Sequence, residues 1–163
     1  MRIKEKPVWR FRINGKQHSP TKSTVSARDI SVTVDEPIER GGTNEGPMPV
    51  EYMMMGLAGC THVIANKLAV HHGAPITDMD IDILATMDSR GTRLIEPIDV
   101  PFPKAVITIK AEMDGPDEAI DKVIRDLKHH CAVSKMLQQS GTQVIEKWTV
   151  NGIERASGEP AAA

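Results

Sequence analysis

The chain has 163 residues, which suits one domain with a substantial hydrophobic core. Its 20 basic and 22 acidic side chains nearly balance, so the composition gives no basic surface for nucleic acid. The N-terminal stretch MRIKEKPVWRFRING lacks the apolar core of a secretory signal peptide, and two cysteines without such a signal indicate reduced thiols in a cytoplasm.

Alternating apolar and polar residues predict two strands in the first third of the chain. Trp9, Phe11 and Ile13 alternate with arginines, and a second alternation runs over residues 30–34. Asn14-Gly15 offers a turn after the first of these strands. We therefore expect a β-hairpin or a small meander in this region.

A long helix is predicted over residues 50–72, after a loop rich in glycine and proline and before a Gly-Ala-Pro stop. Its run MMMGLAGC is apolar on every face, so packing on a single sheet cannot bury it. The apolar run is too short to span a membrane, because polar side chains follow from Thr61 onward. Gly56 and Gly59 would let another backbone approach closely, so we expect a dimer partner on the remaining face.

The second half of the chain alternates strands and helices. Residues 79–87 and 105–110 have strand periodicity and are expected to pair as a hairpin across a long loop at 89–103. A helix with one apolar stripe follows, with Asp114 as its predicted N-cap, and then a second short helix and the closing strand TQVIEKWTV. We expect a single domain over residues 1–152 and a frayed tail at 153–163.

The two cysteines differ in their local setting. Cys60 lies within the apolar helix, where a cysteine commonly serves as a small buried hydrophobe. Cys131 follows His129 and His130 at the start of a short helix, where free amide N–H groups and an imidazolium would favour a thiolate. A zinc site formed from these residues and His62 is an alternative, but side chains two residues apart on a helix project about 200° from each other.

Two motifs carry a resemblance to a known family. GGTNEGPMPVEYMMMGLAGCT resembles the loop and central-helix signature of the osmotically inducible protein C / organic hydroperoxide resistance (OsmC/Ohr) superfamily, and HHCAVSKML resembles its second cysteine motif. The order of the expected elements agrees with this resemblance over residues 25–150. It implies an α+β OsmC-like fold, with antiparallel β-sheets wrapped around a long central helix in an intertwined homodimer.

The resemblance also implies an activity. Such proteins are thiol-dependent peroxidases that reduce organic hydroperoxides in antioxidant and stress responses. The resemblance implies that Cys60 occupies the position of the peroxidatic cysteine, which becomes a sulfenic acid. Cys131 occupies the position of the resolving cysteine, which converts that sulfenic acid into a disulfide. A dithiol or lipoyl-type reductant then restores the thiols, without a metal or other cofactor. We expect a cytoplasmic homodimer that binds neither nucleic acid nor membrane.

Some positions depart from the peroxidase branch and favour the uncharacterised OsmC-like branch. Val50 stands where that branch has a catalytic glutamate. The nearby acid, Glu51, is therefore the third candidate catalytic residue, although it lies half a turn out of phase with Cys60 on a helix. Ala132 replaces a proline often found there. The family's active-site arginine cannot be placed in this sequence, and the candidates are Arg10, Arg12, Arg28 and Arg40. The alternative function is therefore an OsmC-like protein without peroxidase activity that binds a small apolar ligand at the dimer interface, in a pocket lined by some of its nine methionines.

Overall fold

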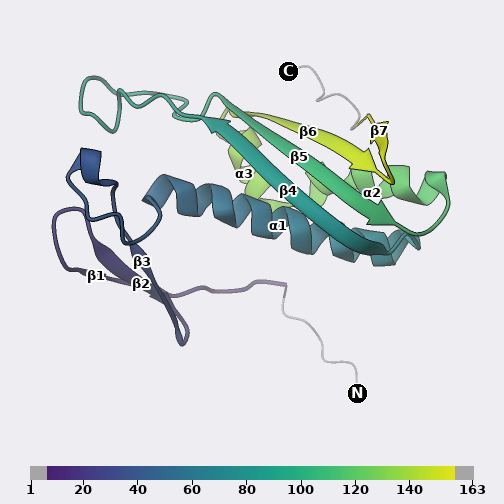
Figure 1. Ribbon diagram of the computed structural model, residues 1–163, viewed down its shortest axis with the longest axis horizontal. Helices are drawn as coiled ribbons and strands as arrows, with labels where there is room; N and C mark the ends of the chain where they lie inside the picture. The colour runs from purple at the N-terminus through teal and green to yellow at the C-terminus, as the bar shows by residue number, and fades with distance from the viewer. Residues whose placement is uncertain (1–6, 157–163) are drawn as a thin grey trace. The chain divides into compact units, whose positions relative to one another are not determined.

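A computed structural model of the chain describes residues 7–156. The chain divides into two compact units, one ending at Met53 and the other beginning at Met54, where the sequence predicted a single domain. Both helices and strands are present in the order expected of an α+β protein (Figure 1).

The N-terminal unit is built on a three-stranded antiparallel meander of β1 (Ile13–Gln17), β2 (Ser23–Ala27) and β3 (Ile30–Val34). The prediction for β3 is confirmed, whereas the predicted strand at residues 9–13 is wrong except for its last residue. Asn14 and Gly15 do not form a turn, because they pair with Ser26 and Val25 inside the β1–β2 ladder. Strand pairing thus overrides the local turn propensity. A short 3-10 helix, η1 (Ile38–Arg40), follows β3.

Helix α1 (Pro49–His72) begins in the N-terminal unit and continues in the next. Its start is stabilised on both sides of the first turn. The Met48 N–H donates to the Glu51 carboxylate at 2.8 Å, and the Tyr52 hydroxyl donates to the Thr33 carbonyl at 2.8 Å. Gly73, in the left-handed conformation with φ of 76°, follows the last turn, as the sequence predicted.

Only one stripe of α1 is buried in the described chain, and it consists of Leu57, Thr61, Ala65, Leu68 and Ala69. Other apolar side chains of the helix are exposed, namely Met55, Val63 and Val70. Helix α1 is long and apolar enough to cross a membrane by length and composition alone. Core helices of soluble proteins meet the same two criteria. The described residues therefore leave part of this helix uncovered, and its cover by a dimer partner stays a prediction.

The C-terminal unit contains a four-stranded sheet in the order β4 (Ile76–Thr86), β5 (Lys104–Met113), β6 (Gln143–Val150) and β7 (Ile153–Arg155). Helices α2 (Asp117–His130) and α3 (Ala132–Gln139) connect β5 to β6 and lie behind the sheet in Figure 1. The expected β4–β5 hairpin is confirmed. The β5–β6 pair is parallel, unlike the antiparallel sheets expected, because the α2–α3 crossover returns the chain to the same end of the sheet.

The core of this unit lies between the sheet and α2. Alternate residues of β5 are buried, including Ile107 and Ile109, and they face an apolar stripe of α2 that includes Ile120, Val123 and Leu127. This stripe is the one that helical periodicity predicts. The buried set thus fixes which face of α2 points inward.

Two predictions at the edges of these elements are wrong. Asp114 is not the N-cap of α2; that position is Pro116, whose extended backbone precedes the first turn without a side-chain cap. The expected frayed tail begins with β7, which pairs with β6, and Arg155 forms ion pairs with Asp117 at 2.5 Å and Asp121 at 3.2 Å. Residues 157–163 of that tail lie outside the described residues.

Candidate functional site

The fold of the C-terminal unit brings its two cysteines together. Cys60 is half-buried on α1, and Cys131 is fully buried at the junction of α2 and α3. The Cys60 side chain is close enough to the Cys131 thiol to raise its pKa. Both thiols are free. Residues that are 71 positions apart in the chain therefore share one site.

The backbone around Cys131 explains why its sulfur is held inside. Its N–H donates to the Leu127 carbonyl at 2.9 Å, as the last hydrogen bond of α2. Its own carbonyl accepts from the Lys135 N–H at 2.9 Å, as the first hydrogen bond of α3. Cys131 is thus both the C-cap of one helix and the N-cap of the next, with an extended backbone between them.

Burial dominates the acidity of Cys131. The pKa of its thiol is raised to about 11 from an ordinary value near 9, mainly because burial removes it from water, and the neighbouring Cys60 contributes to the same increase. The Ser134 backbone N–H and the Thr61 hydroxyl lower it without reversing the outcome. The prediction that the helix start makes Cys131 an acidic thiol is wrong, because removal from water outweighs the helix terminus. Cys131 is protonated at neutral pH.

Two polar side chains at this site were not identified from the sequence. Thr61 and Ser134 are both buried, with exposed fractions of 0% and 1%. Ser134 lies in the first turn of α3, where its backbone amide faces the Cys131 sulfur, and its hydroxyl accepts from the Gln138 amide at 3.0 Å. Thr61 belongs to the buried stripe of α1. It lies four residues from both Leu57 and Ala65, and this helical spacing is a signal that the sequence does contain.

Glu51, the third predicted site residue, has a structural contact in the N-terminal unit. Its side chain is exposed and its carboxylate accepts the Met48 N–H in the first turn of α1. The arginines considered for the family's active site also belong to this unit. Arg40 contacts Met48 at 3.6 Å and Glu36 at 3.8 Å.

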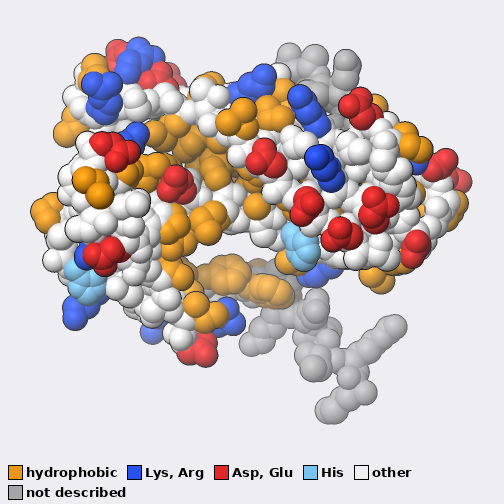
Figure 2. Space-filling model, viewed as in Figure 1, with side chains coloured by type: hydrophobic (Ala, Val, Ile, Leu, Met, Phe, Trp, Pro, Cys, Tyr) orange, Lys and Arg blue, Asp and Glu red, His pale blue; other side chains and the backbone are white. Residues whose placement is uncertain are grey.

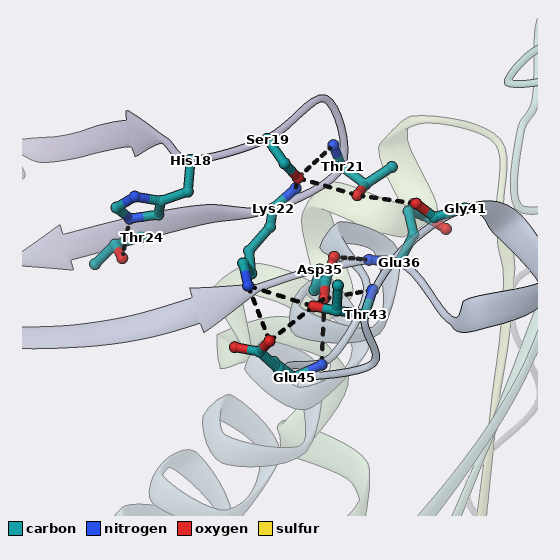
Figure 3. A network of polar contacts seen from close by, with 10 residues as sticks. All are labelled: His18, Ser19, Thr21, Lys22, Thr24, Asp35, Glu36, Gly41, Thr43 and Glu45. Carbon is teal, nitrogen blue, oxygen red and sulfur yellow. Dashed lines mark hydrogen bonds and ion pairs between the residues drawn. The ribbon is translucent and has the colours of Figure 1, made fainter.

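The glycine-rich loop of the first motif is organised by one buried acid, Asp35 (Figure 3). Its carboxylate accepts hydrogen bonds from the Glu36 N–H, from the Thr43 N–H and hydroxyl, and from the Glu45 N–H, over 2.6 to 3.2 Å. These donors hold the pKa of Asp35 well below its usual range, with the Thr43 hydroxyl contributing most. Lys22 pairs with Glu45 at 2.9 Å and closes the network. The loop before α1 is therefore fixed by its own contacts.

Two glycines of this loop are required by close backbone contacts. A Cβ atom on Gly42 would lie 1.7 Å from the Glu36 carbonyl oxygen, and one on Gly46 would lie 2.3 Å from the Thr33 carbonyl oxygen. No side chain fits in either space. The glycine pattern of the motif thus has a packing cause.

A pocket of about 370 Å³ lies in the C-terminal unit, against the last turns of α1 and α2. Its lining combines apolar and basic side chains with one acid, and includes Ile64, Lys67, Leu68, His72, Asp126 and His130. His72 and Asp126 are hydrogen-bonded at 3.0 Å. Ile64 and Leu68 follow Cys60 by one and two helical turns, and His130 precedes Cys131, so the pocket adjoins the helix segments that carry the thiols. Across residues 7–156 no cluster of three or more His, Cys, Asp or Glu side chains is arranged to hold a metal ion.

Comparisons with known proteins agree on one family. The family model described as "OsmC-like protein" matches residues 42–147, which include both cysteine motifs. No curated protein has significant sequence similarity to the chain.

Solved structures of this family share the fold at low sequence identity. An OsmC-like protein from Mycoplasma pneumoniae has a TM-score of 0.73 at 17% identity, over 87% of this chain and 97% of that one. The organic hydroperoxide resistance protein OsmC from Legionella pneumophila has a TM-score of 0.60 at 16% identity, over 89% and 98%. An organic hydroperoxide resistance protein from Elizabethkingia anophelis, with thiocyanate bound, has a TM-score of 0.57 at 14% identity, over 90% and 98%. Because the family match spans more than half of the sequence, the chain belongs to the OsmC-like protein family.

Proposed function

We propose that this protein is a cysteine-based peroxidase that reduces organic hydroperoxides, with Cys60 and Cys131 as its reacting thiols. The observation that carries the proposal is the proximity of a half-buried thiol to a fully buried one within a single compact unit. Two relatives in fold are named organic hydroperoxide resistance proteins, which supports the same chemistry here.

The surroundings of the two thiols support different roles for them. Cys60 is the thiol that a peroxide can reach, because part of its side chain is open to solvent. Cys131 is enclosed, and its raised pKa keeps its thiol protonated at neutral pH. Cys60 is therefore the peroxidatic residue, and Cys131 resolves the product.

The proposed catalytic cycle of the two cysteines needs neither a metal nor a flavin. The Cys60 thiolate attacks the terminal peroxide oxygen, the O–O bond breaks, and the alcohol leaves with one proton. Cys60 becomes a sulfenic acid. Cys131 then attacks its sulfur, an S–S bond replaces the S–O bond, and one water is released. An external dithiol or lipoyl-type reductant returns both residues to thiols by exchange.

The pocket along α1 and α2 supports binding of the organic part of the peroxide. Its volume is within the range of small-molecule sites, and Ile64 and Leu68 give it an apolar wall. Glu51 stabilises the start of the helix that carries Cys60 and takes no direct part in the chemistry.

We also propose that the protein works as a cytoplasmic homodimer. The exposed apolar face of α1 needs a cover, and no atom within 4 Å would meet a Cβ on Gly56 or Gly59. A second copy fits, because its helix backbone can approach these glycines. Gly59→Leu should shift the protein toward monomer in analytical ultracentrifugation. Gly15→Ala, at an ordinary 3.9 Å contact in β1, should not.

Peroxide turnover tests the proposal. Purified protein is mixed with cumene hydroperoxide and dihydrolipoamide, and peroxide loss is followed for wild type, Cys60→Ser and Cys131→Ser. Wild type should turn over, Cys60→Ser should be inactive, and Cys131→Ser should consume one equivalent of peroxide and stop as a sulfenic acid. Turnover that persists in Cys60→Ser contradicts the proposal. A wild type that binds cumyl alcohol but consumes no peroxide would instead support an apolar-ligand-binding protein.

A further inference from the structure

The side chain next to Cys60 has an unusual environment for a core residue. Thr61 is fully buried in α1, and its hydroxyl meets no hydrogen-bond partner of standard geometry among the described residues. Threonines inside helices commonly donate to the carbonyl three or four residues earlier. Thr61 does not, and a buried hydroxyl without a partner is costly. Its position therefore needs a reason beyond packing.

The buried Cys131 thiol is a polar neighbour of this hydroxyl. Thr61 is close enough to favour the ionised form of the Cys131 thiol, and the Ser134 N–H acts in the same direction. A thiol sulfur is a weak acceptor, so in the resting state the hydroxyl has little to bond to. A thiolate at the same place is a strong acceptor, because hydrogen bonds to ionised groups are shorter and stronger.

We propose that Thr61 is a positioning residue for the resolving step, in which its hydroxyl donates a hydrogen bond to the Cys131 sulfur as that sulfur attacks oxidised Cys60. This inference rests on the function proposed above. During the step the Cys131 proton goes to the departing hydroxide of the sulfenic acid and gives water, the S–S bond forms, and Thr61 keeps its own proton. The Thr61 hydroxyl thus supplies the hydrogen bond that water would give to an exposed thiolate, because Cys131 is fully buried.

Thr61→Val tests this with almost no change of side-chain volume, and Thr61→Ser keeps the hydroxyl. The chain also offers a matched control. Thr142, beyond the other end of α3, is equally buried at 4% exposure, and its hydroxyl also has no partner among the described residues. Thr142→Val therefore removes the same group away from the thiols.

The first measurement uses no peroxide. In the Cys60→Ala background, Cys131 is modified with methyl methanethiosulfonate at pH 9, and the rate is followed by mass spectrometry. Loss of the donor lowers the thiolate fraction, so Thr61→Val should slow the modification about tenfold, equivalent to one unit of pKa. A purely structural loosening would act the other way and expose the thiol to faster modification. Thr61→Ser and Thr142→Val should stay within about twofold of their parent.

The second measurement follows the reaction itself. One equivalent of cumene hydroperoxide is added to proteins with both cysteines, and the sulfenic acid is trapped with dimedone at successive times. Thr61→Val should prolong the lifetime of the sulfenic acid about tenfold at pH 7. An unchanged or faster modification of Cys131 in Thr61→Val overturns the inference. A wild type that never forms a sulfenic acid at Cys60 overturns the peroxidase instead, and the modification rates still decide the role of Thr61.

Discussion

Oxidation of the thiol pair should make the protein markedly more stable. A Cys60–Cys131 disulfide would close a loop across the 71 positions that separate the two residues. In the chain-entropy treatment, a loop of this size lowers the entropy of the unfolded state enough to stabilise the fold by about 4 kcal/mol at 25 °C. The sulfurs are already neighbours in the reduced protein, so we expect little of this gain to be lost to distortion. For a chain of this length the melting temperature should rise by about 10 °C.

Urea unfolding of the oxidised and reduced proteins measures this difference. Trp148, buried at 2% exposure, reports the loss of the core by fluorescence, and protein concentration is held constant because association also stabilises. Cys60→Ser and Cys131→Ser, treated with the same peroxide, are the controls and should show no gain. If mass spectrometry maps the Cys60–Cys131 disulfide and the unfolding midpoint is unchanged or lower, the two sulfurs are not adjacent in the reduced fold and the reasoning fails.

Three further predictions concern stability. The pKa of Cys131 is about 11 in the folded protein and near 9 in an unfolded chain, so the unfolded chain loses this proton at lower pH. Roughly 2 kcal/mol of folding stability should therefore be lost between pH 9 and 11. Alkaline denaturation of reduced Cys131→Ala should lack that loss. Gly42→Ala should cost about 2–4 kcal/mol in thermal unfolding, because its Cβ meets the Glu36 carbonyl, and a melting temperature equal to that of Gly15→Ala would contradict this. The pKa of Asp35 is lowered in the fold, so its ionised carboxylate stabilises the fold above the ordinary carboxyl pKa and this stabilisation is lost as pH falls. Asp35→Asn should unfold more easily at pH 7, and its free energy of unfolding should change less on acidification. An acid transition as steep as that of wild type would argue against this account.

Elements that depend on local pattern were predictable from the sequence. The bounds of α1 follow from its apolar run and from the glycine after its last turn, and the inward face of α2 follows from periodicity alone. The position of Cys131 at a helix start was predictable for the same reason. The prediction that the two thiols lie close together rests on the family resemblance, because no local sequence signal links residues so far apart.

Properties set by tertiary packing were not predictable. The acidity of Cys131 depends on how much water its neighbours remove, which no feature of HHCAVSKML records. Asp35 resembles any acid after a strand, and its role depends on Thr43 and Glu45, eight and ten residues later. Asn14-Gly15 has the composition of a turn, yet its partners in β2 keep it extended. In each case a distant contact outweighs the local preference.

The break between α2 and α3 has a mechanical consequence. Cys60 is part of an uninterrupted helix, whose backbone can move only as a rigid rod. Cys131 alone separates two helices, with φ of −73° and ψ of 104°. Rotation about these two bonds would swing one helix against the other, and the buried Leu127 of α2 and Leu137 of α3 hold both helices in the core. The backbone on both sides of the thiol pair is thus held in place, and a bond between the two sulfurs calls for rotation of their side chains alone.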